Sequence, residues 1–110
     1  MSTYLYRIRP DRPELLTDGP TPDEKRVISE HFEYLSGLAD EGVVLLAGRT
    51  QSQTTDDFGL VILFAGSMND AREVMENDPA VRDGVFVGDL FVYRVSLHSK
   101  DILKLLADLS

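Results

Sequence analysis

The stretch FGLVILFAGSMNDAREVMENDP, residues 58–79, decides how this chain folds. Its first nine residues, 58–66, are almost uninterruptedly apolar, which predicts a buried strand. Ser67 is a typical N-cap residue, so a helix is predicted over about 68–77. Pro79 prevents that helix from continuing. A strand is therefore followed directly by a short helix.

A similar strand and helix precede this unit. Residues 3–9 (TYLYRIR) alternate between β-forming side chains and predict a strand, and residues 10–22 hold four prolines and predict a loop. Thr21 as N-cap, a proline at the first helical position and Glu24 form a capping-box pattern that predicts the start of a helix. This helix is expected to run to residue 41, because Gly42 is a typical stop.

The remaining segments complete a known arrangement. Residues 43–49 and 85–97 predict two further strands, 50–57 a polar loop, 80–84 a turn or single helical turn, and 99–110 a C-terminal helix. The order of strands and helices is therefore βαββαβ, followed by a helix. It predicts an α+β, ferredoxin-like fold with a four-stranded antiparallel sheet and two helices on one face.

Length and composition limit the possible functions. A chain of 110 residues fits one domain, which we divide into residues 1–97 and a C-terminal helical extension, 98–110, of the same domain. The chain has no cysteine, which excludes disulfides and cysteine-based metal sites. Its net charge of −8 at pH 7 argues against nucleic acid and anionic membranes as partners. Without an apolar run typical of a signal peptide or membrane span, we expect a cytoplasmic protein.

The third and fourth predicted strands suggest a partner. Helices on one face of an antiparallel sheet leave the other face to solvent, so that face should be polar. Here both faces are apolar: Phe58, Leu60, Ile62 and Phe64 alternate with Val61, Leu63 and Ala65 in the third strand, and Phe86, Leu90 and Val92 alternate with Val85, Val87, Phe91 and Val95 in the fourth. We expect a homodimer that packs sheet against sheet. The alternative is that the C-terminal helix folds back over this face.

One histidine lies within the apolar stripe of the first long helix. This stripe follows helical spacing and comprises Val27, Ile28, Phe32, Leu35, Leu38 and Ala39. His31 falls among these residues and should point toward the sheet or a cleft beside it. A buried imidazole needs a hydrogen-bond partner. On its own, such a histidine is more often a satisfied core residue than a functional group.

Asp78 is a candidate partner for His31. A carboxylate at the end of a helix faces the negative pole of the helix dipole, which is unfavourable unless it has a donor elsewhere. In the predicted fold the two helices run antiparallel, and the second is short. Its end should lie near the first half of the longer helix, close to His31. A carboxylate beside an imidazole can form a general acid–base pair. Alternatively, Asn77-Asp78-Pro79 is ordinary turn chemistry.

The motifs HFEYLSGLADEGVVLLAG (31–48) and NDPAVRDGVF (77–86) occur together here, and the chain resembles the YCII-related family of small bacterial proteins over about residues 3–97. This family is a branch of the dimeric α/β-barrel group. The resemblance implies a ferredoxin-like fold paired through its sheet, with a pocket in each subunit. It also implies that His31 and Asp78 form the active pair. Related barrels carry out isomerisation, elimination or oxygenation, often without a cofactor.

Three further residues are weaker candidates for substrate binding. Many members of the family have Gly-Pro where this chain has Gly48-Arg49, and Arg49 could bind an anionic group or simply lie at the surface. Tyr6 and Arg7 in the first strand could line a pocket, although tyrosine more often fills a core. The two histidines, His31 and His98, are far apart in sequence and predict no metal site.

Three interpretations follow. The first is a cofactor-free lyase or isomerase acting on a small cyclic or aromatic metabolite, with His31 as acid–base and Asp78 as its orienting partner. The second is a non-catalytic, small-ligand-binding or regulatory homodimer in which the same pair is a polar latch. The third is a purely structural role, in which the pair only holds two helices together.

Overall fold

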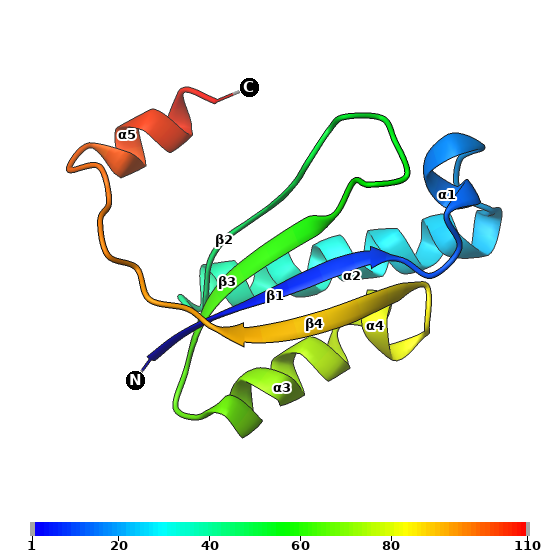
Figure 1. Ribbon diagram of the computed structural model, residues 1–110. Coiled ribbons are helices and arrows are strands. Elements are labelled where there is room, and N and C mark those ends of the chain that lie inside the picture. Colours follow the sequence, from blue (N-terminus) through cyan, green and yellow to red (C-terminus); the bar gives the residue numbers. More distant parts are fainter. Residues whose placement is uncertain (1, 110) are drawn as a thin grey trace.

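The computed structural model describes residues 2–109. Along this part of the chain the elements are β1 (Ser2–Pro10), α1 (Glu14–Thr17), α2 (Pro22–Asp40), β2 (Val44–Arg49), β3 (Gly59–Ala65), α3 (Met68–Asn77), α4 (Pro79–Arg82), β4 (Phe86–Val92) and α5 (Ile102–Ala107) (Figure 1). None of these helices is long and apolar enough to cross a membrane.

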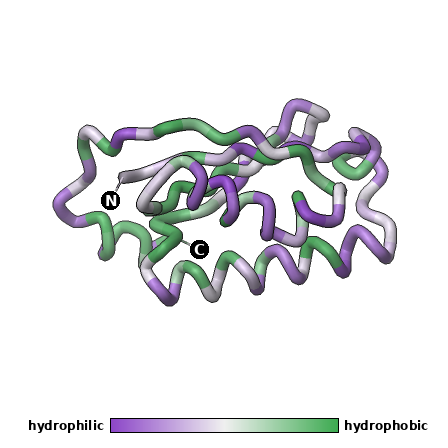
Figure 2. The backbone as a smooth tube through the Cα atoms, turned by 90° about the horizontal axis from the view of Figure 1, so that it is seen from below, coloured by the Kyte–Doolittle hydropathy of each residue, from purple (hydrophilic) through white to green (hydrophobic). Residues whose placement is uncertain are grey.

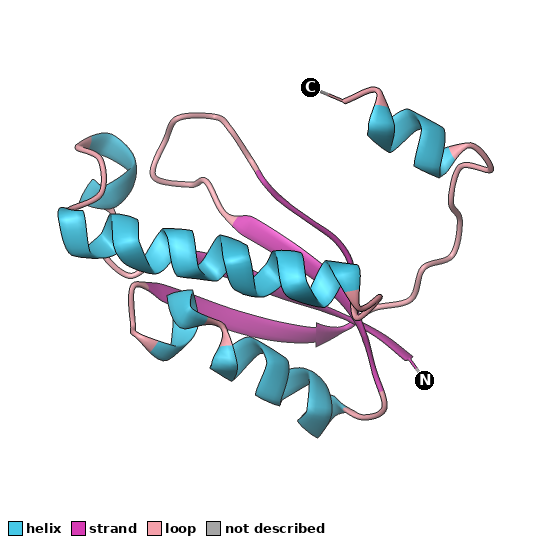
Figure 3. Cartoon of the chain, turned by 180° about the vertical axis from the view of Figure 1, so that it is seen from behind, coloured by secondary structure: helices cyan, strands magenta, loops and turns pink. Residues whose placement is uncertain are grey.

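The four strands form one antiparallel sheet in the order β2-β3-β1-β4. The first and third strands are therefore central, and the second and fourth lie at the edges. Helices α2 and α3 both cover the same face of the sheet, as Figure 3 shows from behind. This arrangement confirms the predicted α+β, ferredoxin-like fold.

Both long helices begin as their sequences predict. The Thr21 hydroxyl accepts the Glu24 N–H at 3.2 Å, and the Glu24 carboxylate accepts the Thr21 N–H at 2.9 Å, which is a complete capping box. Ser67 caps α3 by accepting the Asp70 N–H at 3.1 Å. After α2, Gly42 has a φ of +78°, a left-handed conformation that glycine adopts most easily.

Glu24 is expected to remain ionised to unusually low pH. Its carboxylate is hydrogen-bonded by the Arg12 guanidinium at 2.6 Å and by the Thr21 N–H, which lower the Glu24 pKa from 4.5 to about 2. Because the folded-state pKa is depressed, the stabilisation is present above the unfolded pKa and is lost as the pH falls toward 2. Carboxyl NMR titration should find Glu24 near this value. Arg12→Ala should raise it, and a titration near 4.5 in the unmodified chain would contradict the interaction.

The core lies between the helices and one face of the sheet. Alternate residues of β1 and β3 point into it, and the buried ones are Tyr4, Tyr6, Ile8, Val61, Leu63 and Ala65. Val27 and Leu35 of α2 are buried as predicted, but Phe32 is 71% exposed and Ala39 is also exposed, so the predicted apolar stripe was too wide. Tyr34 packs against the core instead, because the buried face of α2 is rotated toward α3.

The other face of the sheet carries no helix. Residues of β1, β3 and β4 that point to this open face are Leu5, Arg7, Arg9, Leu60, Ile62, Phe64, Val87, Asp89 and Phe91. Phe64 and Phe91 are 38% and 44% exposed. The prediction that both faces of the sheet are rich in apolar residues is therefore confirmed.

Three boundaries differ from the sequence-based expectations. The proline-rich loop contains the short helix α1, because Leu15 turns inward and is buried. The fourth strand ends at Val92 rather than at residue 97, and beyond it the Tyr93 N–H still donates to the Thr3 carbonyl of β1 at 3.1 Å. The C-terminal helix is shorter than predicted and stands away from the sheet, so it does not cover the open face (Figure 1).

Candidate active site

Asp78 occupies the junction between α3 and α4, where it is fully buried. Its backbone is extended, with φ −61° and ψ 122°, as expected for a residue that precedes a proline. The same residue ends α3 and caps the start of α4, because its Oδ1 accepts the Ala80 N–H at 2.9 Å. The carboxylate therefore faces the positive end of a new helical turn.

Two side chains complete the surroundings of this carboxylate. The Tyr6 hydroxyl, from the central strand β1, donates to Oδ2 of Asp78 at 2.7 Å. Nδ1 of His31, from the middle of α2, lies 2.7 Å from Oδ1 and 2.8 Å from Oδ2. The predicted contact between His31 and Asp78 is thus confirmed. Several donors around one buried carboxylate are the usual way to stabilise its charge in a protein interior.

The other nitrogen of His31 remains available. The His31 side chain is 18% exposed. Nε2 of His31 has no hydrogen-bond partner among the described residues. With Nδ1–H donated to Asp78, Nε2 carries the lone pair and can accept a proton.

An aromatic ring lies beside the imidazole. Phe86, the first residue of β4, stacks on His31 with the ring centres 6.5 Å apart and the planes 20° apart. This contact was not predicted, because nothing in the sequence spacing relates residue 86 to residue 31. Phe86 is half-buried and provides an apolar aromatic surface beside the imidazole.

The pKa values of two tyrosines are raised by burial and by the charge of Asp78. Burial raises the pKa of Tyr6 well above its usual range, and the Asp78 charge and hydrogen bond raise it further. Burial, together with the Asp78 charge, raises the pKa of Tyr34 to about 12. Tyr6 therefore stays protonated and remains a hydrogen-bond donor to Asp78 throughout the physiological range.

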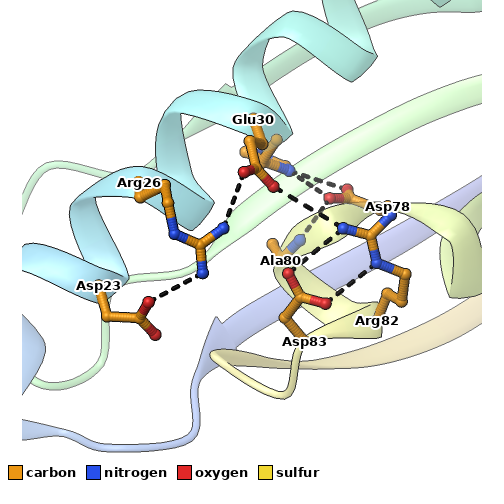
Figure 4. Close-up of polar contacts among 8 residues, drawn as sticks. Asp23, Arg26, Glu30, Asp78, Ala80, Arg82 and Asp83 are labelled. Atoms are coloured by element: carbon orange, nitrogen blue, oxygen red, sulfur yellow. Dashed lines mark hydrogen bonds and ion pairs between the residues drawn. The ribbon is translucent and has the colours of Figure 1, made fainter.

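A chain of ion pairs links α2 to α4 beside the site (Figure 4). Arg26 pairs with Asp23 and Glu30 at 2.8 Å each, Glu30 lies 3.7 Å from Arg82, and Arg82 pairs with Asp83 at 3.0 Å. These side chains are largely exposed, so each pair contributes little to stability. Their effect is to tie the helix that carries His31 to the turn that follows Asp78.

The three weaker candidates are placed differently. Tyr6 joins the histidine–aspartate pair, but as a hydrogen-bond donor to the carboxylate rather than as an exposed pocket residue. Arg7 points to the open face, where it pairs with Asp89 at 3.1 Å and lies over the Phe91 ring at 5.7 Å. Arg49 is exposed at the end of β2. The structure thus separates both arginines from the pair.

Two hollows in the surface of the chain lie away from His31 and Asp78. One, of about 610 Å³, is lined by Leu16, Thr17, Arg49, Thr50, Gln51, Gln53 and Asp57. The other, of about 230 Å³, lies on the open face and is lined by Arg7, Arg9, Thr55, Asp56, Asp57 and Phe58. Within residues 2–109, no three potential metal-binding side chains come together.

Comparison with known proteins identifies the family. The model of the YCII-related domain matches residues 4–93, which include every residue that contacts Asp78. The chain belongs to the YCII-related family. No curated protein matches this YCII-related chain.

A solved structure shares the fold. The protein is similar to 5-chloro-2-hydroxyhydroquinone dehydrochlorinase (TftG) from Burkholderia phenoliruptrix AC1100, solved in complex with 2,5-dihydroxybenzoquinone. The identity is 21% and the TM-score 0.59, and the match covers 83% of the YCII-related chain and 93% of the dehydrochlorinase. At this identity the likeness shows that the two chains share a fold.

Tyr6→Phe is expected to destabilise the protein without leaving a cavity in the core. The substitution removes only the hydroxyl that donates to Asp78 and leaves the ring in place. We expect a loss of about 1–2 kcal/mol in the free energy of unfolding, because the buried carboxylate loses one donor. Urea unfolding measures this. Tyr4→Phe is the matched control in the same strand, and an equal loss in both variants would contradict the role given to the Tyr6 hydroxyl.

Proposed function

We propose that this YCII-related protein is an acid–base enzyme that acts on a small cyclic or aromatic metabolite, as a lyase or isomerase without a cofactor. The observation that carries the proposal is the buried Asp78 carboxylate, 2.7 Å from Nδ1 of His31, whose side chain is 18% exposed. In this arrangement His31 is the catalytic residue and Asp78 and Tyr6 are positioning residues.

The proposed chemistry is proton transfer through Nε2. Nε2 accepts a proton from a C–H or O–H bond of the substrate. The electron pair of that bond then moves into the ring of the substrate. In an elimination, the pair expels a leaving group on the adjacent atom. In an isomerisation, the imidazolium returns the proton to another atom of the ring. Asp78 stabilises the positive imidazolium while it holds the proton.

Two observations favour a cyclic substrate and this reaction class. The similar structure from Burkholderia phenoliruptrix is a dehydrochlorinase, an enzyme that eliminates hydrogen chloride, and it holds a dihydroxybenzoquinone. In the present chain, the Phe86 ring beside His31 offers an apolar face on which a flat ring can stack.

A panel of hydroquinones with and without a halogen substituent tests the proposal. The expected result is conversion of at least one compound by the unmodified chain, followed by absorbance and, for halogenated compounds, by halide release. The substitution His31→Gln should abolish this conversion. A compound that raises the melting temperature but is recovered unchanged would favour the ligand-binding homodimer instead. If no compound of the panel is converted and none raises the melting temperature, this substrate class is contradicted.

We further propose that two copies pair through their open sheet faces. Exposed apolar side chains such as Phe64, Val87 and Phe91 gather there, and a symmetric partner would remove them from water. Phe64→Glu is expected to shift the chain from dimer to monomer in sedimentation velocity. Phe32→Glu is the matched control, because Phe32 is an exposed phenylalanine on the helical side. A monomeric unmodified chain at micromolar concentration would contradict the dimer.

A further inference from the structure

The larger of the two hollows, of about 610 Å³, lies between α1 and the loop that joins β2 to β3 (Figure 1). Its volume falls within the range of about 300–1,000 Å³ that is usual for small-molecule sites. Leu16 and Thr17 of α1 form one wall, and the end of β2 with residues of the loop forms the other. Loop residues 50–57 are hydrophilic throughout, which Figure 2 shows as a purple to white backbone. The hollow is therefore suited to a polar ligand.

The loop wall of this hollow is organised around Asp57, a buried carboxylate. It accepts the Thr50 hydroxyl at 2.8 Å, the Ser52 hydroxyl at 2.6 Å, the Ser52 N–H at 2.8 Å and the Gln53 N–H at 2.7 Å. These bonds, those from Ser52 first, hold the pKa of the Asp57 carboxyl well below its usual range. Asp57 thus stays ionised and keeps its donors at physiological pH, so the wall is formed before any ligand arrives.

The backbone of Gln53 is held in an unusual conformation at this wall. Its φ is +62°, and within residues 2–109 it is the one residue other than glycine with a positive φ. Side chains other than glycine adopt this left-handed region only at an energetic cost. The hydrogen bond from the Gln53 N–H to Asp57 keeps the residue there. Such strained positions concentrate at functional sites, and Gln53 lines the hollow.

Arg49 supplies an available positive charge. It lines the hollow at the end of β2, is exposed, and forms no ion pair with any residue from 2 to 109. Asp57 is the other charged residue of the lining, but the loop already supplies donors to both of its oxygens. The Arg49 guanidinium can therefore donate two parallel hydrogen bonds to the carboxylate of a ligand.

We propose that this hollow is a second binding site, for a small hydroxylated monocarboxylic acid. Arg49 binds the carboxylate, and the Thr17 hydroxyl and the side-chain amides of Gln51 and Gln53 bind the hydroxyl groups. Hydroxyl and amide groups both donate and accept hydrogen bonds, which matches the hydroxyl groups of the ligand. A single negative charge is favoured, because the lining offers one available cation and the chain carries a net charge of −8. The site does not include His31 or Asp78, so the inference does not rest on the proposed enzyme.

Titration of the ¹⁵N-labelled full chain with sodium D-gluconate tests the site by NMR. At constant ionic strength we expect saturable shifts in the amides of residues 50–53 and in the Arg49 Nε–H signal. Sorbitol has the hydroxyl groups without the carboxylate, and acetate has the carboxylate without the hydroxyl groups. Each should bind about tenfold more weakly or less. Equal binding of acetate would overturn the hydroxyl contacts, equal binding of sorbitol would overturn the role of Arg49, and shifts absent from these residues would overturn the site.

Substitutions of exposed arginines separate a specific contact from general charge. Arg49→Gln should weaken gluconate binding about tenfold or more, because the charge-assisted hydrogen bonds are lost. Arg49→Lys keeps the charge without the planar fork and should lose less. Arg72→Gln is the matched control: Arg72 is exposed on α3, also without an ion pair among residues 2–109, and its variant should bind gluconate within about twofold of the unmodified chain. An unchanged affinity in Arg49→Gln, or an equal loss in Arg72→Gln, would overturn the proposal.

Discussion

Replacing His31 by glutamine is expected to lower kcat/KM about 100-fold or more, the usual contribution of a general acid–base group. Glutamine can still donate a hydrogen bond toward Asp78, so the local fold should survive. It cannot accept and return a proton, which is the role proposed for Nε2. Asp78→Asn should cause a loss of similar size, because an amide can neither fix the Nδ1–H tautomer nor stabilise the imidazolium. Steady-state kinetics with a compound converted by the unmodified chain measures both.

The second histidine provides a matched control. His98 is exposed, and the one hydrogen bond of its ring within residues 2–109 is to the neighbouring Ser99 carbonyl, at 3.0 Å. His98→Gln should leave kcat/KM within about twofold of the unmodified value, because this imidazole touches neither Asp78 nor its surroundings. If the His31 and Asp78 variants both retained activity to within a few-fold, the proposed mechanism would be wrong even with a real substrate in hand.

Asp78→Ala is expected to be among the most destabilising single substitutions in this chain. Its removal leaves the Tyr6 hydroxyl and the Ala80 N–H without an acceptor in a buried site, and α4 loses its cap. Each buried donor without a partner costs about 1–3 kcal/mol, so we expect a loss of about 3 kcal/mol or more in the free energy of unfolding. Urea denaturation followed by circular dichroism measures it. Asp78→Asn keeps one acceptor and should lose less.

Asp83, five residues after Asp78, serves as a control at the surface. Its replacement shows the effect of removing a carboxylate charge without removing buried hydrogen bonds. It is paired only with the neighbouring Arg82 at the surface. Asp83→Ala should therefore leave the urea midpoint nearly unchanged. A similarly small effect for Asp78→Ala would show that the buried hydrogen bonds of Asp78 do not stabilise the junction between α3 and α4.

Much of the fold could be predicted from local signals. The capping box at Thr21 and the N-cap at Ser67 predicted the helix starts, alternation of side chains predicted β1, and a nearly continuous apolar run predicted β3. The contact between His31 and Asp78 also followed, because a short helix antiparallel to a long one brings its end near the middle of the other. These inferences needed only short-range chemistry and one common topology.

The remaining features depend on packing across the sheet. The sequence does not show that Tyr6 donates to Asp78 or that Phe86 stacks on His31, because both contacts join elements far apart in the chain. The exposure of Phe32 depends on how α2 is rotated against α3. The early end of β4 at Val92 could not be predicted either, because the alternation of side chains continues beyond it.

The tautomer of His31 is the most direct test of the site. Long-range ¹H–¹⁵N NMR spectra at mildly alkaline pH distinguish a protonated from an unprotonated ring nitrogen for each histidine. We expect a proton on Nδ1, donated to Asp78, and a lone pair on Nε2. A proton on Nε2 would place the Nδ1 lone pair against the buried carboxylate and would contradict the proposed role of His31.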